Sequence, residues 1–360
     1  MPTTYAEFGP NTEATEVAQA FQDRVRGKTV LVTGGSIKGI GYATAYAMAS
    51  QAPAHLILAG RTPAKLTECI DALKAAFPAV DVRPLPIDLS SQASVRKAAA
   101  AVLGWADVPT IDYVFNTAGV MGLPQRTLSV DGIEMQMATN HMGHWLLSCL
   151  LMPKLIAAAR GQPKGSVRIV NVSAGSAFIG AMRWSDMNFD VVNKHLPAAE
   201  QPNYAFMTRW GYTGLEDVAY AGIDGYNRSK VANVLAAVGT THALYASHGI
   251  LSVAVHPGVI PTELGRDFEP LVLDSVQAMV ADGTISYKTL GAGASTSLVA
   301  ALDSKVTVEA RGGPRNRENY GVFMVDCQVS DGATDLATSS AEAARLWALS
   351  EDLVKEKFSW

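Results

Sequence analysis

The sequence predicts an α/β fold in which a doubly wound parallel sheet lies between two layers of helices. Short runs of β-branched and apolar residues alternate with segments of helical periodicity along the 360-residue chain. A glycine-rich turn, residues 33–41, follows the first apolar run and precedes a helical pattern. Strands and helices that alternate in this way are typical of a parallel sheet covered on both faces. We therefore expect a single domain with three layers, α/β/α.

Seven segments have the composition of buried strands, and segments with helical periodicity connect the first three of these strands. Helices are expected over Tyr42–Ser50 and Ala64–Phe77. Residues 1–26 precede the first strand, and we expect them to form a helical N-terminal extension. The α/β domain is then expected to cover residues 27–360. The expected strands are Thr29–Val32, His55–Ala59, Asp81–Leu85, Ile111–Phe115, Val167–Val172, Leu251–Val255 and Gly321–Val325.

Two regions interrupt the alternation of strands and helices. Residues 178–225 are rich in aromatic and polar residues, and we interpret them as an enlarged substrate loop. Residues 303–319 include Arg311–Arg317, whose Gly, Pro, Asn and Arg residues predict an exposed loop. Residues 262–360 are expected to supply a lid and the C-terminal helices. Neither irregular region has the composition of a linker between domains.

Composition and charge exclude several classes of protein. The formal net charge is −4 and no run of Lys and Arg is present, so neither nucleic acid nor an anionic membrane is expected as the main partner. Three widely spaced cysteines and seven histidines without ligand spacing predict neither a disulfide framework nor a metal site. These features favour a soluble enzyme in a reducing compartment.

No segment of the sequence has the features of a signal peptide or a membrane span. The first twenty residues lack an apolar core and carry several acidic residues. The longest apolar stretch, Trp145–Ala159, contains Pro153 and Lys154, and we expect it to be too short and too interrupted to cross a bilayer. A cytoplasmic location is therefore expected.

The glycine-rich turn has the features of a dinucleotide site. Unpaired N–H groups at the start of the following helix, together with its dipole, favour a pyrophosphate. Arg61 follows the second strand. A site for a cofactor with a free ribose 2′-hydroxyl would have Asp or Glu at this place. Arg61, together with Lys38, therefore indicates a site for the 2′-phosphate of NADP(H). The alternative is that both are ordinary surface cations. The turn residues expected to bind are Gly35, Ser36, Lys38, Gly39, Ile40 and Gly41.

Tyr226 and Lys230 form the most informative pair in the sequence. Residues four apart share one face of a helix, and an ammonium close to a phenol favours the phenolate. Lys230 is therefore expected to lower the pKa of Tyr226 toward working pH, as a proton donor to a carbonyl oxygen requires. Ser173 follows the apolar run Val167–Val172. This is oxidoreductase chemistry, provided that a hydride donor binds nearby.

These motifs, in this order, resemble those of the short-chain dehydrogenases/reductases. The resemblance covers about Gly27–Leu349 and is closest to the retinol-dehydrogenase and WW-domain-oxidoreductase branch, although no WW domain is visible. It implies a Rossmann-like fold and the catalytic tetrad Asn140, Ser173, Tyr226 and Lys230. The chain departs from the family pattern by one additional residue between Thr33-Gly34 and Gly39.

The resemblance also implies a role for each member of the tetrad. Ser173 would donate a hydrogen bond to the substrate carbonyl, Tyr226 would protonate that oxygen, and Lys230 would hold the cofactor ribose. Asn140 would hold a water that connects Lys230 to solvent. The family commonly assembles through the helices that carry the Tyr and Lys, so a homodimer or homotetramer is expected unless the additional segments block that surface.

Further cofactor contacts follow from the same resemblance. An acidic residue and its neighbour after the third strand would touch adenine, small residues after the fourth would pass beneath the cofactor, and a Pro-Gly turn after the sixth would hold the nicotinamide carboxamide. These residues are Asp88, Leu89, Asn116, Ala118, Gly119, Pro257, Gly258, Val259 and Thr262.

The enlarged loop suggests the class of substrate. Its aromatic residues and methionines could wall a large apolar pocket, and Phe268, Leu271, Val272 and Leu273 could form a mobile lid. Both favour a bulky hydrophobic or aromatic ketone, aldehyde or alcohol, such as a compound of secondary metabolism. Alternatively, the loop packs on the protein's own surface or on another subunit.

Two other functions remain open at the level of sequence. The same fold and cofactor could serve a different NADPH-linked step, namely reduction of an enone or aromatic system, or epimerisation. The chain could also be a non-catalytic NADP(H)-binding regulator. Such a protein would bind the cofactor without turnover, and Tyr226→Phe would leave cofactor binding unaffected.

Overall fold

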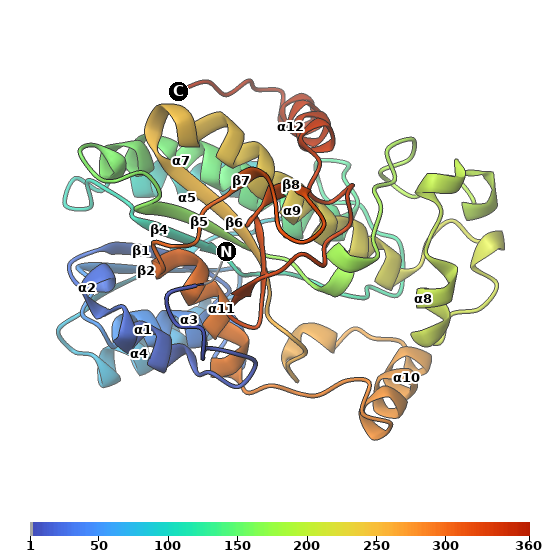
Figure 1. The fold of residues 1–360 in the computed structure, drawn as a ribbon, viewed down its shortest axis with the longest axis horizontal. Helices are drawn as coiled ribbons and strands as arrows, with labels where there is room; N and C mark the ends of the chain where they lie inside the picture. The colour runs from blue at the N-terminus through green and yellow to red at the C-terminus, as the bar shows by residue number, and fades with distance from the viewer. Residues whose placement is uncertain (1–2) are drawn as a thin grey trace.

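A mostly parallel eight-stranded sheet forms the centre of the computed structural model, which describes residues 3–360 (Figure 1). The strand order is β10-β9-β6-β5-β4-β1-β2-β3, and only β10 runs antiparallel to its neighbour. Because β1 lies between β2 and β4, the chain order reverses beside β1, where doubly wound sheets bind their ligands. The strands are β1 (Thr29–Thr33), β2 (His55–Gly60), β3 (Asp81–Pro86), β4 (Tyr113–Asn116), β5 (Val167–Val172), β6 (Ile250–His256), β9 (Phe323–Val325) and β10 (Gln328–Val329).

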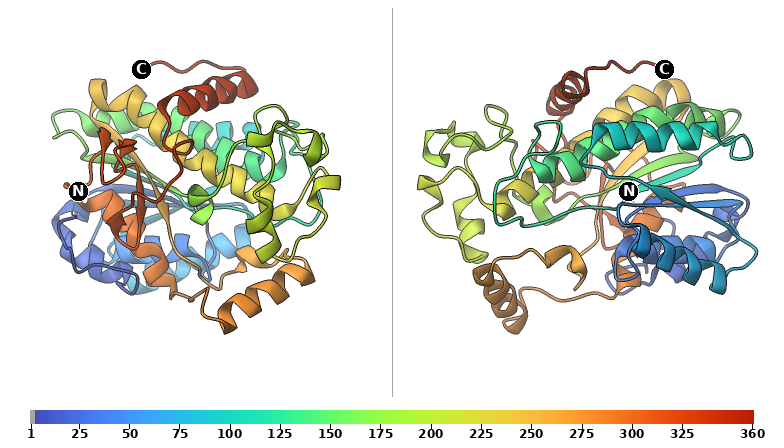
Figure 2. Two further views of the ribbon diagram at one scale, coloured as in Figure 1. Left: turned by 45° about the vertical axis from the view of Figure 1, so that its right-hand side comes forward. Right: turned by 180° about the vertical axis from the view of Figure 1, so that it is seen from behind.

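Two layers of helices cover the sheet (Figures 1 and 2). Helices α5 (Gln92–Gly104), α7 (Gly143–Ala159) and α9 (Gly222–His248) enclose one apolar core with the sheet. On the opposite face α3 (Ile40–Ala49), α4 (Pro63–Ala76) and α11 (Leu290–Leu302) enclose a second. The predicted three-layer Rossmann-like fold is therefore confirmed, and each predicted strand is found with its ends displaced by at most two residues.

The residues before β1 pack against the sheet domain. They form α1 (Ala14–Ala20) and α2 (Gln22–Val25), and α1 lies against α3 and α11. Further toward the N-terminus, the Thr4 hydroxyl donates to Asp303 at 2.7 Å, and the Thr3 hydroxyl donates to Gln328 of β10 at 2.8 Å. The beginning of the chain is thus attached to one edge of the central sheet.

The prediction of an exposed loop over Arg311–Arg317 is confirmed only for residues 313–316, which form an exposed turn, because the ends of the segment lie in strands. This segment is part of a β-hairpin, β7 (Glu309–Gly312) and β8 (Arg317–Tyr320), paired antiparallel. Ionic contacts hold it, because Arg317 pairs with both Asp331 and Asp335. The hairpin therefore lacks the apolar alternation by which strands are predicted from sequence.

The prediction that Pro153 and Lys154 interrupt the longest apolar stretch is also wrong. A continuous helical segment, Met135–Ala159, comprises α6 (Met135–Met137), a π-helical turn η1 (Ala138–Met142) and α7. It is long and apolar enough to cross a membrane by length and composition, but 67% of its most apolar window is buried inside the fold. The Lys154 ammonium donates to the carbonyls of Trp105 and Val108. Packing in the protein core thus accounts for its apolar character.

The enlarged loop is built from short helices: η2 (Gly175–Phe178), η3 (Asn193–His195), η4 (Ala198–Glu200), α8 (Tyr204–Arg209) and η5 (Leu215–Asp217). After β6 follow η6 (Glu263–Gly265) and α10 (Pro270–Ala281), and α12 (Ser340–Val354) lies near the C-terminus. Helices α8 and α10 lie close together beside the sheet domain (Figure 2). They share an apolar cluster, here called the α8–α10 cluster, of Met207, Tyr212, Leu215, Ala221, Ile223 and Val272.

Candidate active site

Three of the predicted catalytic residues meet at the end of β5. Tyr226 and Lys230 lie one turn apart near the start of α9 and are both buried. The Lys230 ammonium donates to the carbonyl of Val172 at 2.8 Å, and the Ser173 hydroxyl donates to the Lys230 carbonyl at 2.6 Å. The helix carrying Tyr226 is therefore joined directly to the strand that carries Ser173.

Asn140 completes this group from the π-helical turn η1. Its Oδ1 accepts the Val120 N–H at 2.8 Å, and its Nδ2 donates to the Ser229 hydroxyl at 2.9 Å. A Cβ added to Gly119 would lie 3.0 Å from Asn140 Oδ1 and 3.6 Å from Lys230 Nζ. Asn140 and Lys230 thus approach each other beside a residue that has no side chain, and the predicted tetrad lies within one cluster.

The electrostatics of Tyr226 and Lys230 differ from the prediction. Burial raises the pKa of Tyr226, and burial lowers the pKa of Lys230 to about 7. Lys230 Nζ lies 5.6 Å from the centroid of the Tyr226 ring and hydrogen-bonds Val172 instead of the phenol. The expectation that Lys230 lowers the pKa of Tyr226 is therefore wrong for this structure, because lost hydration outweighs their mutual influence.

The glycine-rich turn leaves backbone groups open at the start of α3. A Cβ on Gly41 would lie 2.6 Å from the Gly34 carbonyl, so this close approach requires glycine. The Gly39 N–H donates to the Ser36 carbonyl at 2.9 Å, and the turn that this closes accommodates the additional residue of this chain. Gly39 is the N-cap residue of α3, and no side chain accepts a hydrogen bond from the N–H groups at this end of the helix. The first N–H groups of α3 are therefore available to an anion.

Three cations surround this turn. Lys38 and Arg61 are exposed, and neither makes an ion pair or a hydrogen bond within residues 3–360. The third, Lys65 of α4, pairs with Glu263, whose carboxylate also accepts the Ser36 hydroxyl at 3.2 Å. Lys65 and Glu263 were not predicted, since their contact joins residues far apart in the chain. The region nevertheless fits the phosphate groups of a dinucleotide, because the side-chain charges that are not engaged in an ion pair there, those of Lys38 and Arg61, are positive.

Several predicted cofactor residues have side chains that are already engaged. Asp88 Oδ1 accepts the N–H and the hydroxyl of Ser90, at 3.0 and 2.7 Å. Leu89 is buried in the core, and Asn116 Nδ2 donates to Asn171 Oδ1 at 2.9 Å. Leu89 and Asn116 could therefore contribute to a cofactor site mainly through their backbone.

The predicted Pro-Gly turn lies opposite the glycine-rich turn. Gly258, which follows Pro257, has φ +87°, and the Lys288 side chain packs where its Cβ would stand. Val259 is exposed and forms a bridge with Tyr287, and the Thr262 hydroxyl accepts the Leu264 N–H at 3.2 Å. Since Glu263 contacts Ser36, the two predicted cofactor elements face each other across a short gap.

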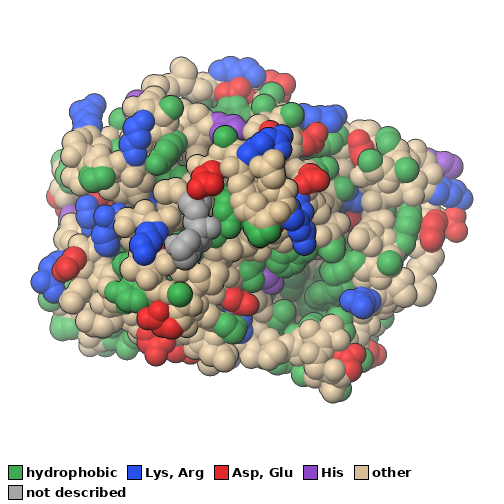
Figure 3. Space-filling model, viewed as in Figure 1, with side chains coloured by type: hydrophobic (Ala, Val, Ile, Leu, Met, Phe, Trp, Pro, Cys, Tyr) green, Lys and Arg blue, Asp and Glu red, His purple; other side chains and the backbone are tan. Residues whose placement is uncertain are grey.

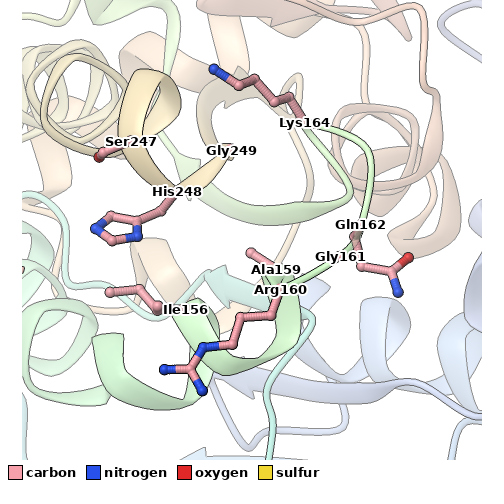
Figure 4. Close-up of a pocket in the computed structure, with 9 residues that line it drawn as sticks. All are labelled: Ile156, Ala159, Arg160, Gly161, Gln162, Lys164, Ser247, His248 and Gly249. Carbon is pink, nitrogen blue, oxygen red and sulfur yellow. The ribbon is translucent and has the colours of Figure 1, made fainter.

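A cavity of about 400 Å³ lies at a different place in the fold (Figure 4). It is formed where α7 and α9 end, before β5 and β6 begin, and its lining includes Arg160, Lys164 and His248. The Lys164 ammonium donates to the carbonyl of Ala246, near the end of α9. Because Ser173 follows the opposite end of β5, this cavity is separate from the tetrad.

Comparisons with known proteins decide the family. The family model for short chain dehydrogenases matches residues 28–186. An oxidoreductase of Fusarium equiseti, fscI, is 33% identical over 251 residues, which are 70% of this chain and 94% of that protein. The chain belongs to the short-chain dehydrogenase/reductase family.

Other short-chain dehydrogenases/reductases agree with this assignment. Human retinol dehydrogenase 13 is 33% identical over 242 residues, which are 67% of this chain and 62% of that protein. The NADPH-bound carbonyl reductase from chicken fatty liver has the same fold, with a TM-score of 0.55 and 21% identity over 85% of this chain and 99% of its own. The resemblance to this family that the motifs predicted is confirmed, retinol dehydrogenase 13 is among the relatives, and the chain is an oxidoreductase of this family.

Thr33 organises this short-chain dehydrogenase/reductase in a way that the sequence did not indicate. Its hydroxyl oxygen accepts the N–H groups of Thr117 and Ala118, at 2.9 and 3.0 Å. The same oxygen lies 2.8 Å from Nε2 of His144, whose Nδ1 lies 3.0 Å from the Asn140 carbonyl. Thr33 thus connects β1 and the segment after β4 to the turn that carries Asn140. Its position as the first residue of the glycine-rich turn was the only available signal.

Proposed function

We propose that the chain is an NADP(H)-dependent reductase or dehydrogenase that interconverts a bulky hydrophobic or aromatic ketone or aldehyde and its alcohol. The observation that carries the proposal is the convergence of Ser173, Tyr226, Lys230 and Asn140 beside the glycine-rich turn. This arrangement combines a proton donor, a hydrogen-bond donor and a buried cation. A proton donor and a hydrogen-bond donor near one oxygen atom favour reduction of a carbonyl, and the buried cation could hold the cofactor ribose.

The side chains of the tetrad would act on the substrate oxygen. When bound, a nicotinamide cofactor supplies or accepts the hydride. Tyr226 would donate the phenolic proton to the oxygen, and Ser173 would turn its hydroxyl from the Lys230 carbonyl toward the same atom. Lys230 uses one of its three donors on Val172, which leaves two for a ribose. In the oxidative direction Tyr226 would receive the proton from the alcohol.

Cofactor preference is part of the proposal. Lys38 and Arg61 are exposed cations near the glycine-rich turn, and neither forms a close ion pair in the part of the chain that the structure describes, although the Lys38 charge acts on Glu263. A 2′-phosphate would form such a pair, whereas an acidic residue at position 61 would favour a free hydroxyl. The structurally similar chicken carbonyl reductase contains NADPH. These observations support NADP(H) over NAD(H).

The α8–α10 cluster supports a bulky apolar substrate. Hydrophobic side chains line a hollow between these helices and the sheet domain (Figure 3). The Phe268 ring lies where a Cβ of Gly122 would stand, and Trp210 packs edge-on against it at 6.2 Å. Part of the enlarged loop packs elsewhere, since Trp184 and Met187 lie against the main core. We therefore assign the pocket wall to the segment around α8 and the lid to the segment around α10.

The test is turnover by the wild type and by Tyr226→Phe. NADPH oxidation would be followed against a panel of bulky ketones and aldehydes, with NADPH binding measured by fluorescence. Removing the proton donor is expected to lower turnover by about 100- to 10,000-fold while binding persists. Tyr245→Phe is the control, because Tyr245 lies toward the far end of α9. Binding without turnover by the wild type would favour a regulator, and absence of binding would refute the cofactor assignment.

A further inference from the structure

His256 lies beside Ser173 in the sheet. It is the last residue of β6, and the preceding Val255 is in register with Val172 of β5. The Ser173 N–H donates to the Val255 carbonyl at 2.8 Å, so the next pair in register is Ser173 and His256. Residues in register on parallel strands project to the same face of the sheet. The imidazole therefore stands on the face where Ser173 reaches α9.

The start of the enlarged loop borders the imidazole. Its Nε2 lies 3.6 Å from the place that a Cβ of Gly175 would occupy, so a side chain at this position would touch the ring. The Phe178 ring meets the imidazole edge-on, with centroids 6.1 Å apart, and is itself 38% exposed. His256 is thus placed between the catalytic serine and an exposed aromatic ring.

The ring nitrogens of His256 have no protein partner. Nδ1 is buried without a hydrogen bond, and within residues 3–360 Nε2 makes none either. The charged neighbours Lys288 and Asp326 pair with each other instead. Burial, reinforced by the Lys288 charge, lowers the pKa of His256 to about 4, so at neutral pH one nitrogen is a donor and the other an acceptor. Unpaired buried polar groups are rare in folded proteins and require an explanation.

We propose that His256 is a substrate-positioning residue, which hydrogen-bonds a second, uncharged oxygen on the substrate. The inference rests on the proposed function and narrows the substrate class from bulky ketones in general to hydroxyketones or diketones. A hydroxyl or carbonyl group suits a neutral imidazole, which can donate or accept. A carboxylate does not suit it, because Lys288, the cation that acts on the imidazole among the described residues, is already paired with Asp326.

The experiment compares substrates that differ only in the second oxygen. The wild type would be assayed with α-tetralone and each of its monohydroxylated isomers, and the preferred isomer would be used for the variants. His256→Phe is expected to reduce the preference for that isomer over unsubstituted α-tetralone, measured as the ratio of the kcat/KM values, about tenfold and mainly through KM. His256→Asn, which keeps a donor and an acceptor, is expected to recover part of the loss. Equal effects on substituted and unsubstituted substrates would indicate a structural role and overturn the proposal.

His248→Phe is the matched control. His248 also has a buried ring nitrogen without a partner, but it lines the cavity beyond the other end of the sheet (Figure 4). This variant is expected to leave the discrimination between the two substrates unchanged. If it alters discrimination as strongly as His256→Phe does, the effect is not local to the site.

A binding experiment distinguishes failure of this inference from failure of the proposed function. If the wild type turns over no tetralone, the proposed reaction fails for this panel, and the position of His256 is tested without turnover. The imidazole nitrogen resonances of His256 would be recorded with NADP⁺ and each isomer. A shift with one hydroxylated isomer, absent with α-tetralone, is expected. Resonances that do not move with any isomer would overturn the inference.

Discussion

At the scale of single residues, Lys230 is a buried cation whose protonation depends on its surroundings. Its pKa is about 7 in the folded chain, against an ordinary value of 10.5. The unfolded chain therefore binds more protons than the folded chain between these two pH values. Folding is opposed by the full cost of burying the ammonium below pH 7, and this cost disappears as the pH rises toward 10.5.

Lys230→Met should reveal this dependence in the cofactor-free protein. As the pH rises from about 7 to about 10, the free energy of unfolding of the wild type is expected to increase relative to that of the variant. Urea unfolding at a series of pH values measures the difference. A difference that stays constant over this range, or that falls, would show that Lys230 is not a desolvated cation.

Arg61 offers a second test at a single position. Arg61→Asp is expected to weaken NADPH binding by about 10- to 100-fold and NADH binding much less, because the proposed contact that would be lost is a charge-assisted hydrogen bond to the 2′-phosphate. Titration with both cofactors measures this. Arg160→Asp is the control for net charge, since Arg160 is exposed beside the remote cavity. Equal losses for both cofactors would exclude Arg61 from the 2′-phosphate site.

At the scale of elements, η6 and the glycine-rich turn are joined through one carboxylate. Glu263 accepts hydrogen bonds from Ser36 and Lys65, and the Lys65 ammonium lowers the pKa of the Glu263 carboxyl. A negative charge there competes with a phosphate for the same donors. Glu263→Gln is expected to tighten NADPH binding by about two- to fivefold, as for an exposed ion pair.

Glu269→Gln is the matched control for this prediction. Glu269 lies in the same segment after β6 as Glu263, between η6 and α10. Its carboxylate accepts a hydrogen bond from the Tyr212 hydroxyl at 3.2 Å and does not touch the glycine-rich turn. Its replacement should leave the dissociation constant of NADPH unchanged. Weaker binding by Glu263→Gln would mean that the carboxylate supports the cofactor site instead of competing for it.

The sequence predicts those elements whose signal is local. Strands such as Thr29–Val32 are short runs of β-branched and apolar residues, and Tyr226 and Lys230 are recognisable from a spacing of one helical turn. The hairpin of β7 and β8 was missed because ion pairs with Asp331 and Asp335 hold it. The direction of the Tyr226 pKa shift was missed for a related reason, since burial depends on the whole fold. Contacts between distant residues, such as Ser36 with Glu263, leave no local pattern.

At the scale of the whole molecule, the C-terminal residues cover the helix that carries Tyr226 and Lys230. Trp347 of α12 packs where a Cβ of Gly239 in α9 would lie, and it meets Trp145 of α7 edge-on at 5.3 Å. Phe358 contacts the same Trp145 at 5.4 Å. Part of the surface on which the family commonly assembles is therefore occupied by this chain itself. The homodimer or homotetramer stays a prediction.

Trp347→Ala tests how far the molecule depends on this cover. Loss of a large, partly buried aromatic side chain is expected to cost about 2–4 kcal/mol of the free energy of unfolding, measured with urea. Faster hydrogen exchange along α9 should accompany it. Tyr46→Ala, which removes a more exposed aromatic residue from α3, is expected to cost less. A loss for Trp347→Ala no larger than this control would show that α12 contributes little to the fold.

The position of α12 also bears on how the protein is synthesised. Domains fold as units while the ribosome extends the chain from the N-terminus. Residues 340–360 are synthesised well after α7, and they supply Trp347 and Phe358, which cover Trp145. Until these residues have left the ribosome, an aromatic surface on α7 lacks its native cover. The nascent enzyme is then most exposed to aggregation, and chaperone binding would be most useful to it at that stage.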